Sequence, residues 1–393
     1  MNYQVLCETV KEEDPVSIVV VGVGGGGSNA VNGMIGRGIQ GVKFIAVNTD
    51  VQALRANKAE VKLQIGAKVT GGRGAGGDPE KGEKSALEDR EQIAKALEGA
   101  DMVFVTACMG GGTGTGAAPI IAEIAKSQNA LAVGVVTKPF AVLKDHQMEI
   151  AEKGIAKMRE VVDTLIVIPN QKLLNNVDRK TSILETFRRA DDILRQGIES
   201  ISDCIVKTGF INIDFADAMT VMKDQGDALM AIGYGTGENR VEEAVSSVLD
   251  NPLLEDTSIK GSTRALIYVA ANEDLPALEY DDVIKRITSD MDKDAIVKAG
   301  LYFDTSLEDK IKVTVIATGF NNEMKFRNHE PAKAQKSEIM SEREFDAFIG
   351  NGLIKEYLLP RGDKRNDYKY SNEDLDVPTV IRDGRVLTFS SEA

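Results

Sequence analysis

The 393-residue sequence contains no tryptophan, two histidines and three cysteines. His146 and His329 are far apart, which argues against a histidine-rich metal site and weakens any Ser-His-Asp arrangement. Cys7, Cys108 and Cys204 show no close spacing, a pattern expected in a reducing cytoplasm and not in a disulfide framework. We therefore expect chemistry that depends on neither histidine nor thiolate, and no resident metal site.

Positive charge is also scarce. The chain has 47 Lys and Arg against 61 Asp and Glu, a net charge of -14. A protein this acidic is a poor general ligand for nucleic acid and for anionic membranes. No apolar run approaches the roughly 18 residues that span a bilayer, and residues 1–15 are polar and acidic, unlike a secretory signal. We expect a cytoplasmic protein with no nucleic-acid partner and no direct membrane insertion.

Short apolar runs alternate with helix-like stretches over the first two-thirds of the chain. The runs cover residues 17–23, 43–48, 101–107, 130–137 and 164–169. This alternation is typical of βαβ units, so we predict an α/β fold with a Rossmann-like parallel sheet. Sheets of this kind bind ligands at the carboxyl ends of their strands.

A long helix is predicted over residues 180–209. Ser182 and Glu185 form a capping-box pattern at its start, and Gly209 is the expected stop. Its apolar residues cover a wide face, which favours burial between two layers or domains. A smaller α/β segment follows, with strands near residues 264–270 and 312–318.

Glycine is abundant, with 37 residues, and it is clustered in three loops at residues 22–27, 71–77 and 110–116. Residues without Cβ let backbone N–H groups approach phosphate oxygens, and a following helix adds its positive end. Thr113 and Thr115 can add hydroxyl donors, and Asp78-Pro79 suits the start of a helix. Three such loops favour phosphate binding over flexible surface turns, and none matches the Walker spacing.

The first loop also satisfies the dinucleotide pattern G-x-G-x-x-G, and Asp50 lies near the usual distance for ribose binding. An NAD(P)-dependent oxidoreductase is therefore an alternative. It leaves the second and third glycine loops unexplained.

The third loop, GGGTGTG, resembles the signature of the tubulin/FtsZ family of GTPases, and in particular its FtsZ branch. Further matching stretches are GVGGGGSNAV (22–31), AVNTD (46–50), TKPF (137–140), IPNQKLL (168–174), NIDFADAMTVM (212–222) and DLDVPTVIR (374–382). The resemblance implies a GTPase that binds GTP/GDP, with Mg²⁺ expected, and polymerises head to tail into cytoskeletal filaments. It further implies a scaffold for bacterial cell division, located at the division site.

The resemblance also implies nucleotide contacts. Those to phosphate fall on Gly25, Gly26, Gly27, Asn29, Ala75, Gly76, Gly112, Thr113 and Gly114. Base recognition falls on Phe187 and Asp191, one helical turn apart. An aromatic ring can stack on a purine, and a carboxylate can accept from N1 and N2 of guanine, a donor pair that adenine lacks. From spacing alone, Phe187 is expected in the core and Asp191 in solvent. The resemblance instead favours contact of both side chains with the base.

Asn212, Asp214 and Asp217 form a second constellation. From the residues alone, Asp217 could cap or open the following helix and Asp214 could be a turn residue. The resemblance instead places all three as catalytic residues that enter the nucleotide site of the next subunit, where the carboxylates orient the attacking water. Hydrolysis would then depend on assembly.

One stretch departs from the family pattern. Leu143 stands where the family has Glu, and Gln147 stands where it has Arg, although Gln147 can still donate a hydrogen bond and Lys144 could compensate. We predict weaker or differently arranged nucleotide binding. The change motivates a second alternative, a polymerising nucleotide-binding scaffold with weak or no GTPase activity.

The expected organisation has six parts. They are an N-terminal extension (1–15), a GTP-binding domain (16–180), a central connecting helix (181–209), a C-terminal activation domain (210–320), a flexible linker (321–371) and a partner-binding peptide (372–393). The linker carries apolar residues over 345–359, either scattered in a disordered chain or forming a transient helix. The resemblance implies that residues 374–385 dock membrane adaptors and regulators.

Overall fold

The computed structural model describes residues 16–141, 145–173, 181–207, 209–251 and 259–320. The predictions for the N-terminal extension, Leu143, the linker and the terminal peptide lie outside these residues. Those parts and the domain limits stay predictions. No helix in the described ranges is long and apolar enough to cross a membrane.

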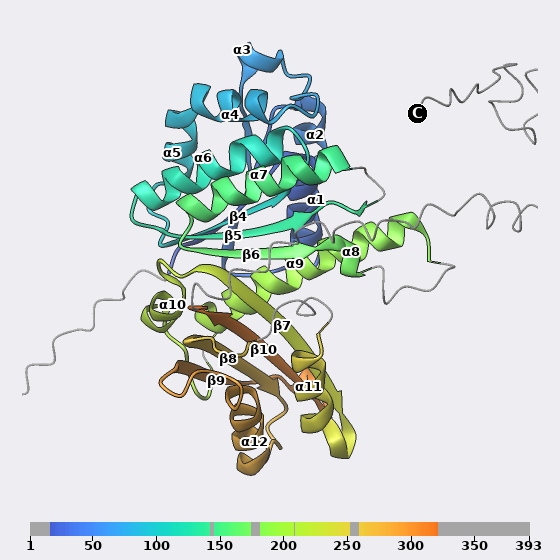
Figure 1. The fold of residues 1–393 in the computed structure, drawn as a ribbon, viewed down its shortest axis with the longest axis vertical. Coiled ribbons are helices and arrows are strands. Elements are labelled where there is room, and N and C mark those ends of the chain that lie inside the picture. Colours follow the sequence, from blue (N-terminus) through green and yellow to red (C-terminus); the bar gives the residue numbers. More distant parts are fainter. Residues whose placement is uncertain (1–15, 142–144, 174–180, 208, 252–258, 321–393) are drawn as a thin grey trace, which may run out of the picture. The chain divides into compact units, whose positions relative to one another are not determined.

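The described residues form one sheet of ten strands, in the order β3-β2-β1-β4-β5-β6-β7-β10-β8-β9 (Figure 1). The strands are β1 (Ile18–Val23), β2 (Val42–Asn48), β3 (Val61–Gln64), β4 (Met102–Cys108), β5 (Leu131–Lys138), β6 (Thr164–Pro169), β7 (Gly226–Thr236), β8 (Arg264–Ala271), β9 (Ile296–Phe303) and β10 (Lys310–Thr318). The first six pair in parallel, in the order 3-2-1-4-5-6 of a Rossmann fold. The predicted fold class is confirmed.

Helices cover both faces of the parallel part. One face packs against α1 (Gly24–Gly36), α9 (Ile183–Val206) and α10 (Phe215–Met222). The other packs against α4 (Pro79–Glu88), α5 (Arg90–Leu97), α6 (Thr113–Ser127) and α7 (Asp145–Val161), of which α6 and α7 cross the near side in Figure 1. The shorter helices are α2 (Val51–Ala56), α3 (Ala67–Thr70) and α8 (Asn170–Leu173). Strands buried on both faces explain the continuous apolar runs of the sequence.

The C-terminal part is the smaller α/β unit that the sequence predicts. β10 runs antiparallel to both β7 and β8, and β9 is parallel to β8 at the sheet edge. α11 (Arg240–Leu249) and α12 (Ala277–Thr288) pack with this part of the sheet around its own core. β3, β7 and β9 were not predicted, because β3 is short and the other two carry glycine or lysine among their apolar residues.

The long helix begins where its capping box predicts, because the Ser182 hydroxyl accepts a hydrogen bond from the Glu185 N–H at 3.2 Å. It ends at Val206, before Gly209, so the predicted stop is wrong. Gly209 has another role. A Cβ placed on it would lie 2.7 Å from the carbonyl oxygen of Leu301, so glycine allows the chain after α9 to pass close to β9.

Candidate functional site

The site lies where the strand order reverses, between β1 and β4. These two strands are parallel neighbours, so their carboxyl ends meet at one edge of the sheet. The chain leaves β1 into α1 on one face and leaves β4 towards α6 on the other. This divergence opens a crevice between them, and the N-terminal ends of both helices border it.

The first glycine loop is set by close packing of backbone. Gly24 has φ of +71°, and a Cβ on it would lie 2.8 Å from the N atom of Gly114. On Gly27 a Cβ would lie 2.3 Å from the carbonyl oxygen of Thr106 in β4. The G-x-G-x-x-G pattern therefore brings α1 against β4 and against the third loop.

The second loop rests on the third. A Cβ on Gly112 would lie 2.9 Å from Cβ of Ala75 and 2.8 Å from the N atom of Asp78. Asp78 caps α4 as predicted, accepting from the Glu80 N–H at 2.9 Å, with proline at the first helical position. The three glycine segments thus belong to one packed unit.

A cavity of about 350 Å³ opens at this junction. Among the predicted nucleotide residues, its lining includes Gly25, Gly26, Gly112, Thr113, Gly114 and Asp191. A Cβ on Gly25 or on Gly111 would meet no atom within 4 Å, so the backbone at these positions faces open space. Such backbone is accessible to a phosphate.

Four predicted residues do not line the cavity: Gly27, Asn29, Ala75 and Gly76. Gly27 and Ala75 are buried in the contacts described above, whereas Asn29 and Gly76 are exposed. Their assigned contacts with nucleotide stay predictions.

The two threonines of the third loop have structural partners. Thr115 accepts a hydrogen bond from the Gly110 N–H at 3.0 Å and does not line the cavity, so we assign it to holding the loop. Thr113 lies in the cavity wall, and its hydroxyl contacts the Thr49 hydroxyl at 2.7 Å in a buried pair.

Three cavity residues were not singled out as site residues from the sequence. Asn170 follows β6 and is 6% exposed, and its Oδ1 has no hydrogen-bond partner among the described residues. A buried polar atom of this kind needs a partner, which a ligand can supply. Thr137 and Cys108 lie at the ends of β5 and β4, and burial raises the pKa of the Cys108 thiol to about 11. The sequence holds a signal for two of them. Thr137 belongs to the TKPF stretch and Asn170 to the IPNQKLL stretch, and both stretches lie at the ends of predicted strands.

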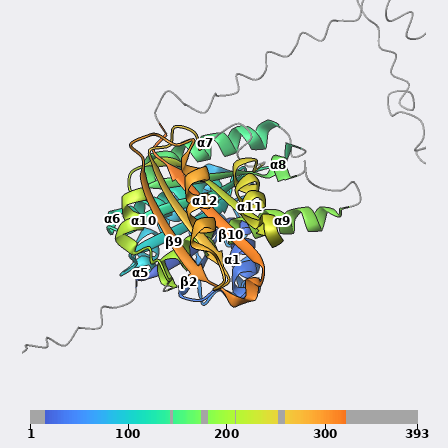
Figure 2. The same ribbon diagram turned by 90° about the horizontal axis from the view of Figure 1, so that it is seen from below.

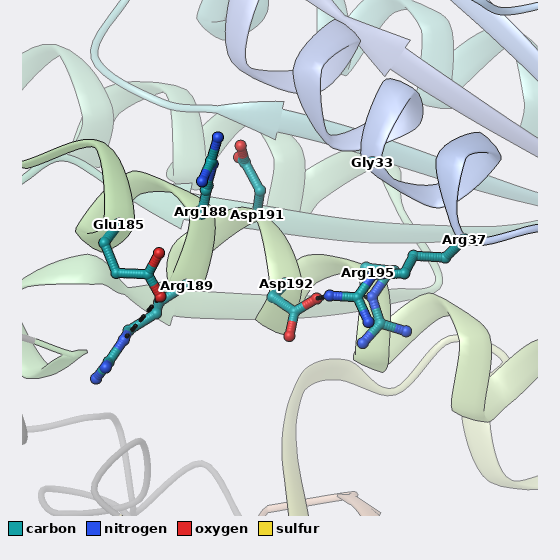
Figure 3. A pocket seen from close by; sticks show the side chains of 8 residues that line it. All are labelled: Gly33, Arg37, Glu185, Arg188, Arg189, Asp191, Asp192 and Arg195. Carbon is teal, nitrogen blue, oxygen red and sulfur yellow. Dashed lines mark hydrogen bonds and ion pairs between the residues drawn. The ribbon is translucent and has the colours of Figure 1, made fainter.

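Asp191 borders this cavity from α9, and burial raises its carboxyl pKa to about 6. It also borders a second cavity of about 400 Å³ beside α1, lined by Gly33, Arg37, Glu185, Arg188, Arg189, Asp191, Asp192 and Arg195. Figure 3 shows Arg188 and Asp191 on the same side of α9, whereas Asp192 turns away to pair with Arg195 at 2.8 Å. The side chain of Phe187 lies outside what the structure describes.

Gln147 lies in the first turn of α7 and lines the cavity. Its carbonyl oxygen is 2.9 Å from the position of a Cβ on Gly110, so α7 begins directly beside the third loop. Gln147 therefore lies in the wall of the cavity, and its contact with nucleotide stays a prediction.

The second constellation lies at the far end of α9. Asp214, not Asp217, caps α10, and its Oδ1 accepts from the Asp217 N–H at 2.7 Å. Asn212 accepts from the Gly209 N–H at 3.3 Å. The Asp217 carboxylate pairs with Lys298 at 2.7 Å. The capping role suggested for Asp217 thus belongs to Asp214, whereas Asp217 lies in the first turn of the helix.

None of these three residues lines the glycine-loop cavity. Within the described ranges, no group of three or more His, Cys, Asp or Glu side chains is arranged to hold a metal ion.

Asp50 does not lie in the cavity wall either. It caps α2, accepting from the N–H groups of Gln52 at 2.8 Å and Ala53 at 3.3 Å. Its position outside the cavity wall disfavours the oxidoreductase alternative, in which Asp50 would bind the ribose.

Comparisons with known proteins agree with this geometry. Residues 17–178 match the model of the tubulin/FtsZ family GTPase domain, and residues 226–321 match that of the FtsZ family C-terminal domain. An empty FtsZ dimer from M. jannaschii is 42% identical, with a TM-score of 0.74, over 78% of this chain and 89% of that one. A point mutant of FtsZ from M. jannaschii matches over 92% of its own length and 78% of this chain, at the same identity and TM-score.

A GTPγS-bound protofilament of CetZ2 from Haloferax volcanii shares the fold at 18% identity, with a TM-score of 0.67, over 78% of this chain and 94% of that one. The class is therefore that of tubulin-like GTPases. The chain belongs to the tubulin/FtsZ family, and its C-terminal domain is of the FtsZ type.

Proposed function

We propose that the chain binds and hydrolyses GTP, polymerises head to tail and completes each active site across the interface between two protomers. One observation carries this proposal: most of the length of α9 separates Asp191 from the segment that carries Asn212, Asp214 and Asp217. Asp191 borders the cavity, and fifteen further residues of helix lead to Val206. At 1.5 Å per residue this is about 22 Å, and the charge of Asp217 acts on Cys204 near that end of the helix, so Asp217 lies far from the protein's own nucleotide.

The cavity suits a nucleotide triphosphate. Open backbone at Gly25 and Gly111 and the N-terminal end of α6 supply N–H groups and a positive field for phosphate oxygens. Asn170 offers a buried, unpartnered oxygen to a donor on the nucleotide. Any Mg²⁺ would arrive with the phosphates, since the described residues form no carboxylate cluster that could hold it first.

Asp191 is placed to select the base. Its carboxylate is half-buried in the cavity wall, where the N1 and N2 donors of guanine would compensate its lost hydration. Adenine presents no such pair, so GTP would be preferred to ATP.

Asp214 and Asp217 supply the hydrolytic half of the site. In a filament their loop enters the cavity of the next protomer, where a carboxylate orients and polarises the attacking water. An interface that joins two different surfaces in this way is open and builds filaments. We further propose a role in a division ring and docking of adaptors through residues 374–385, both of which rest on the resemblance of the sequence to the FtsZ branch of the family.

A filament with weak or no hydrolysis is the second candidate. It is favoured by Gln147, which lines the cavity without the charge and fork geometry of arginine.

Phosphate release measured against protein concentration, with GTP and with ATP, tests the proposal alongside sedimentation. We expect a critical concentration, a preference for GTP, and polymer above the threshold. Polymer without phosphate release supports the second candidate. Turnover that rises linearly from zero protein, with no polymer, contradicts both.

A further inference from the structure

The two faces of β9 contact different partners. Val297, Ala299 and Leu301 pack into the C-terminal core. Because side chains alternate along a strand, Lys298 and Gly300 lie on the opposite face. α10 contacts both β8 and β9, and Figure 2 shows it beside β9.

That loop is hydrogen-bonded to the strand. The Phe210 N–H donates to the Leu301 carbonyl at 2.8 Å, and the Leu301 N–H donates to the Ile211 carbonyl at 3.0 Å. A Cβ on Gly300 would lie 2.8 Å from Cδ1 of Ile213, so glycine at this position lets the loop lie against the sheet. The segment that carries the predicted catalytic residues is therefore fixed to β9 at its start.

Lys298 fixes the segment at its other end. Its Nζ lies 2.7 Å from Oδ1 of Asp217, one turn into α10, and the Asp214 carboxylate nearby caps the same turn. The ion pair raises the Lys298 pKa, with a further contribution from the charge of Asp214. Lys298 thus stays protonated beside two carboxylates throughout the neutral range.

We propose that Lys298 is a positioning residue for hydrolysis, which holds the Asp217 carboxylate in one orientation through Oδ1 and leaves Oδ2 to bind the attacking water. The proposal rests on the proposed function, in which Asp217 serves the next protomer. It adds an electrostatic role: two carboxylates repel a triphosphate, and the Lys298 ammonium offsets part of that repulsion as the interface closes.

The pair is well suited to a mutational test. Both side chains are partly exposed, at 36% for Lys298 and 27% for Asp217, and ion pairs of this kind contribute little to stability. Replacing Lys298 should therefore leave the fold intact, which a thermal melt of the full chain checks.

The experiment compares three variants of the full chain above the critical concentration. Lys298→Met removes the charge and keeps the chain length, Lys298→Arg keeps the charge, and Lys285→Met removes the lysine of another exposed pair, with Asp281 on α12. We expect Lys298→Met to lower GTP turnover per polymerised protomer about tenfold, a barrier change of roughly 1.4 kcal/mol. GTP affinity below the critical concentration should stay unchanged, Lys298→Arg should recover most of the turnover, and Lys285→Met should match wild type.

Asp217→Asn separates this inference from the proposed function. If Asp217→Asn abolishes turnover while Lys298→Met has no effect, only the positioning role is wrong. If Asp217→Asn retains turnover, the proposed function fails, and the positioning role with it. When both variants are impaired, adding Lys298→Met to Asp217→Asn should cause no further loss. Independent losses, a rise in turnover for Lys298→Met, or no recovery with arginine would each overturn the positioning role.

Discussion

The glycine-lined crevice and the loop before α10 are built in opposite ways. In the crevice, backbone packs against backbone within one protomer, as Gly24 does against Gly114 and Gly27 against Thr106. In the loop and the first turn of α10, side chains carry the proposed chemistry, and the Asp217 carboxylate is partly exposed with only Lys298 as its ion partner among the described residues. The first region is complete as folded. In the proposed function the second supplies catalytic groups to a neighbouring protomer, because its carboxylates lie outside the cavity of their own chain.

The largest effect should come from removing the carboxylate of the second region. We expect Asp217→Ala to lower turnover about 10²-fold or more, because a positioned general base contributes about 10²- to 10⁴-fold. GTP binding below the critical concentration should be unaffected, since the residue lies outside the cavity. Phosphate release and nucleotide binding, measured on the same preparation, check this. Equal losses in both would place Asp217 in its own protomer's site and remove the distinction between the two regions.

The close packing of the crevice predicts opposite effects for two glycines of α1. A methyl group at Gly27 would lie 2.3 Å from a backbone oxygen that cannot move aside, so Gly27→Ala should destabilise by about 3 kcal/mol. At Gly33 the same methyl group meets nothing within 4 Å, and Gly33→Ala should stabilise by about 0.5–1 kcal/mol. Urea denaturation compares them directly. If both variants were equally stable, glycine at 27 would not be required by packing.

Protonation of Asp191 should weaken GTP binding in mild acid. The carboxyl pKa of about 6 in the free protein falls on binding, because the ionised form accepts from guanine. GTP affinity should therefore be constant above pH 6 and fall by up to about tenfold per unit below it. Titration of the monomer at several pH values checks this, and Asp191→Asn should show no such slope. The same slope in the variant would assign the effect to another group.

The same shift has a consequence for the stability of the nucleotide-free protein. The folded pKa lies above the ordinary value of 3.8, so folding takes up a proton between about pH 4 and pH 6. Stability therefore decreases as pH rises through that window. Asp191→Asn should melt higher than wild type at pH 7, with the difference vanishing below about pH 4. A difference that is independent of pH would contradict the assignment.

The smallest effect should come from Gln147. A hydrogen bond to a charged acceptor contributes about 1.5–3 kcal/mol, and the half-exposed Gln147 should lie at the low end of that range, so Gln147→Ala should reduce GTP affinity by roughly tenfold. Gln147→Arg should increase it, because a charged fork binds phosphate better than an amide does. Calorimetric titration with GTP of wild type, Gln147→Ala and Gln147→Arg ranks their affinities. Affinity that is identical in all three would show that Gln147 does not contact nucleotide.

The sequence predicts the parallel sheet well because buried strands are continuous apolar runs. It does not predict β7 and β9, because glycines in both strands and Lys298 in β9 interrupt the apolar run. In β9 these residues contact the segment before and within α10. The same limit applies to the site. The clustering of glycine in the sequence predicts the three loops. It does not predict which residues they pack against, such as Thr106 for Gly27, because these are distant in sequence. Lys298 could not be found at all, because its pairing with Asp217 depends on the edge strand lying against the loop.

Mixing two inactive variants tests the central claim most directly. Asp217→Ala protomers bind GTP but cannot complete a neighbour's site, and Asp191→Ala protomers bind GTP weakly but keep an intact loop. At a GTP concentration too low to fill the second variant, each alone should be nearly inactive. An equal mixture should recover about a quarter of the wild-type rate, since half the protomers hold GTP and half of those face an intact Asp217. A mixture no more active than the sum of its components would show that the site is not shared between protomers.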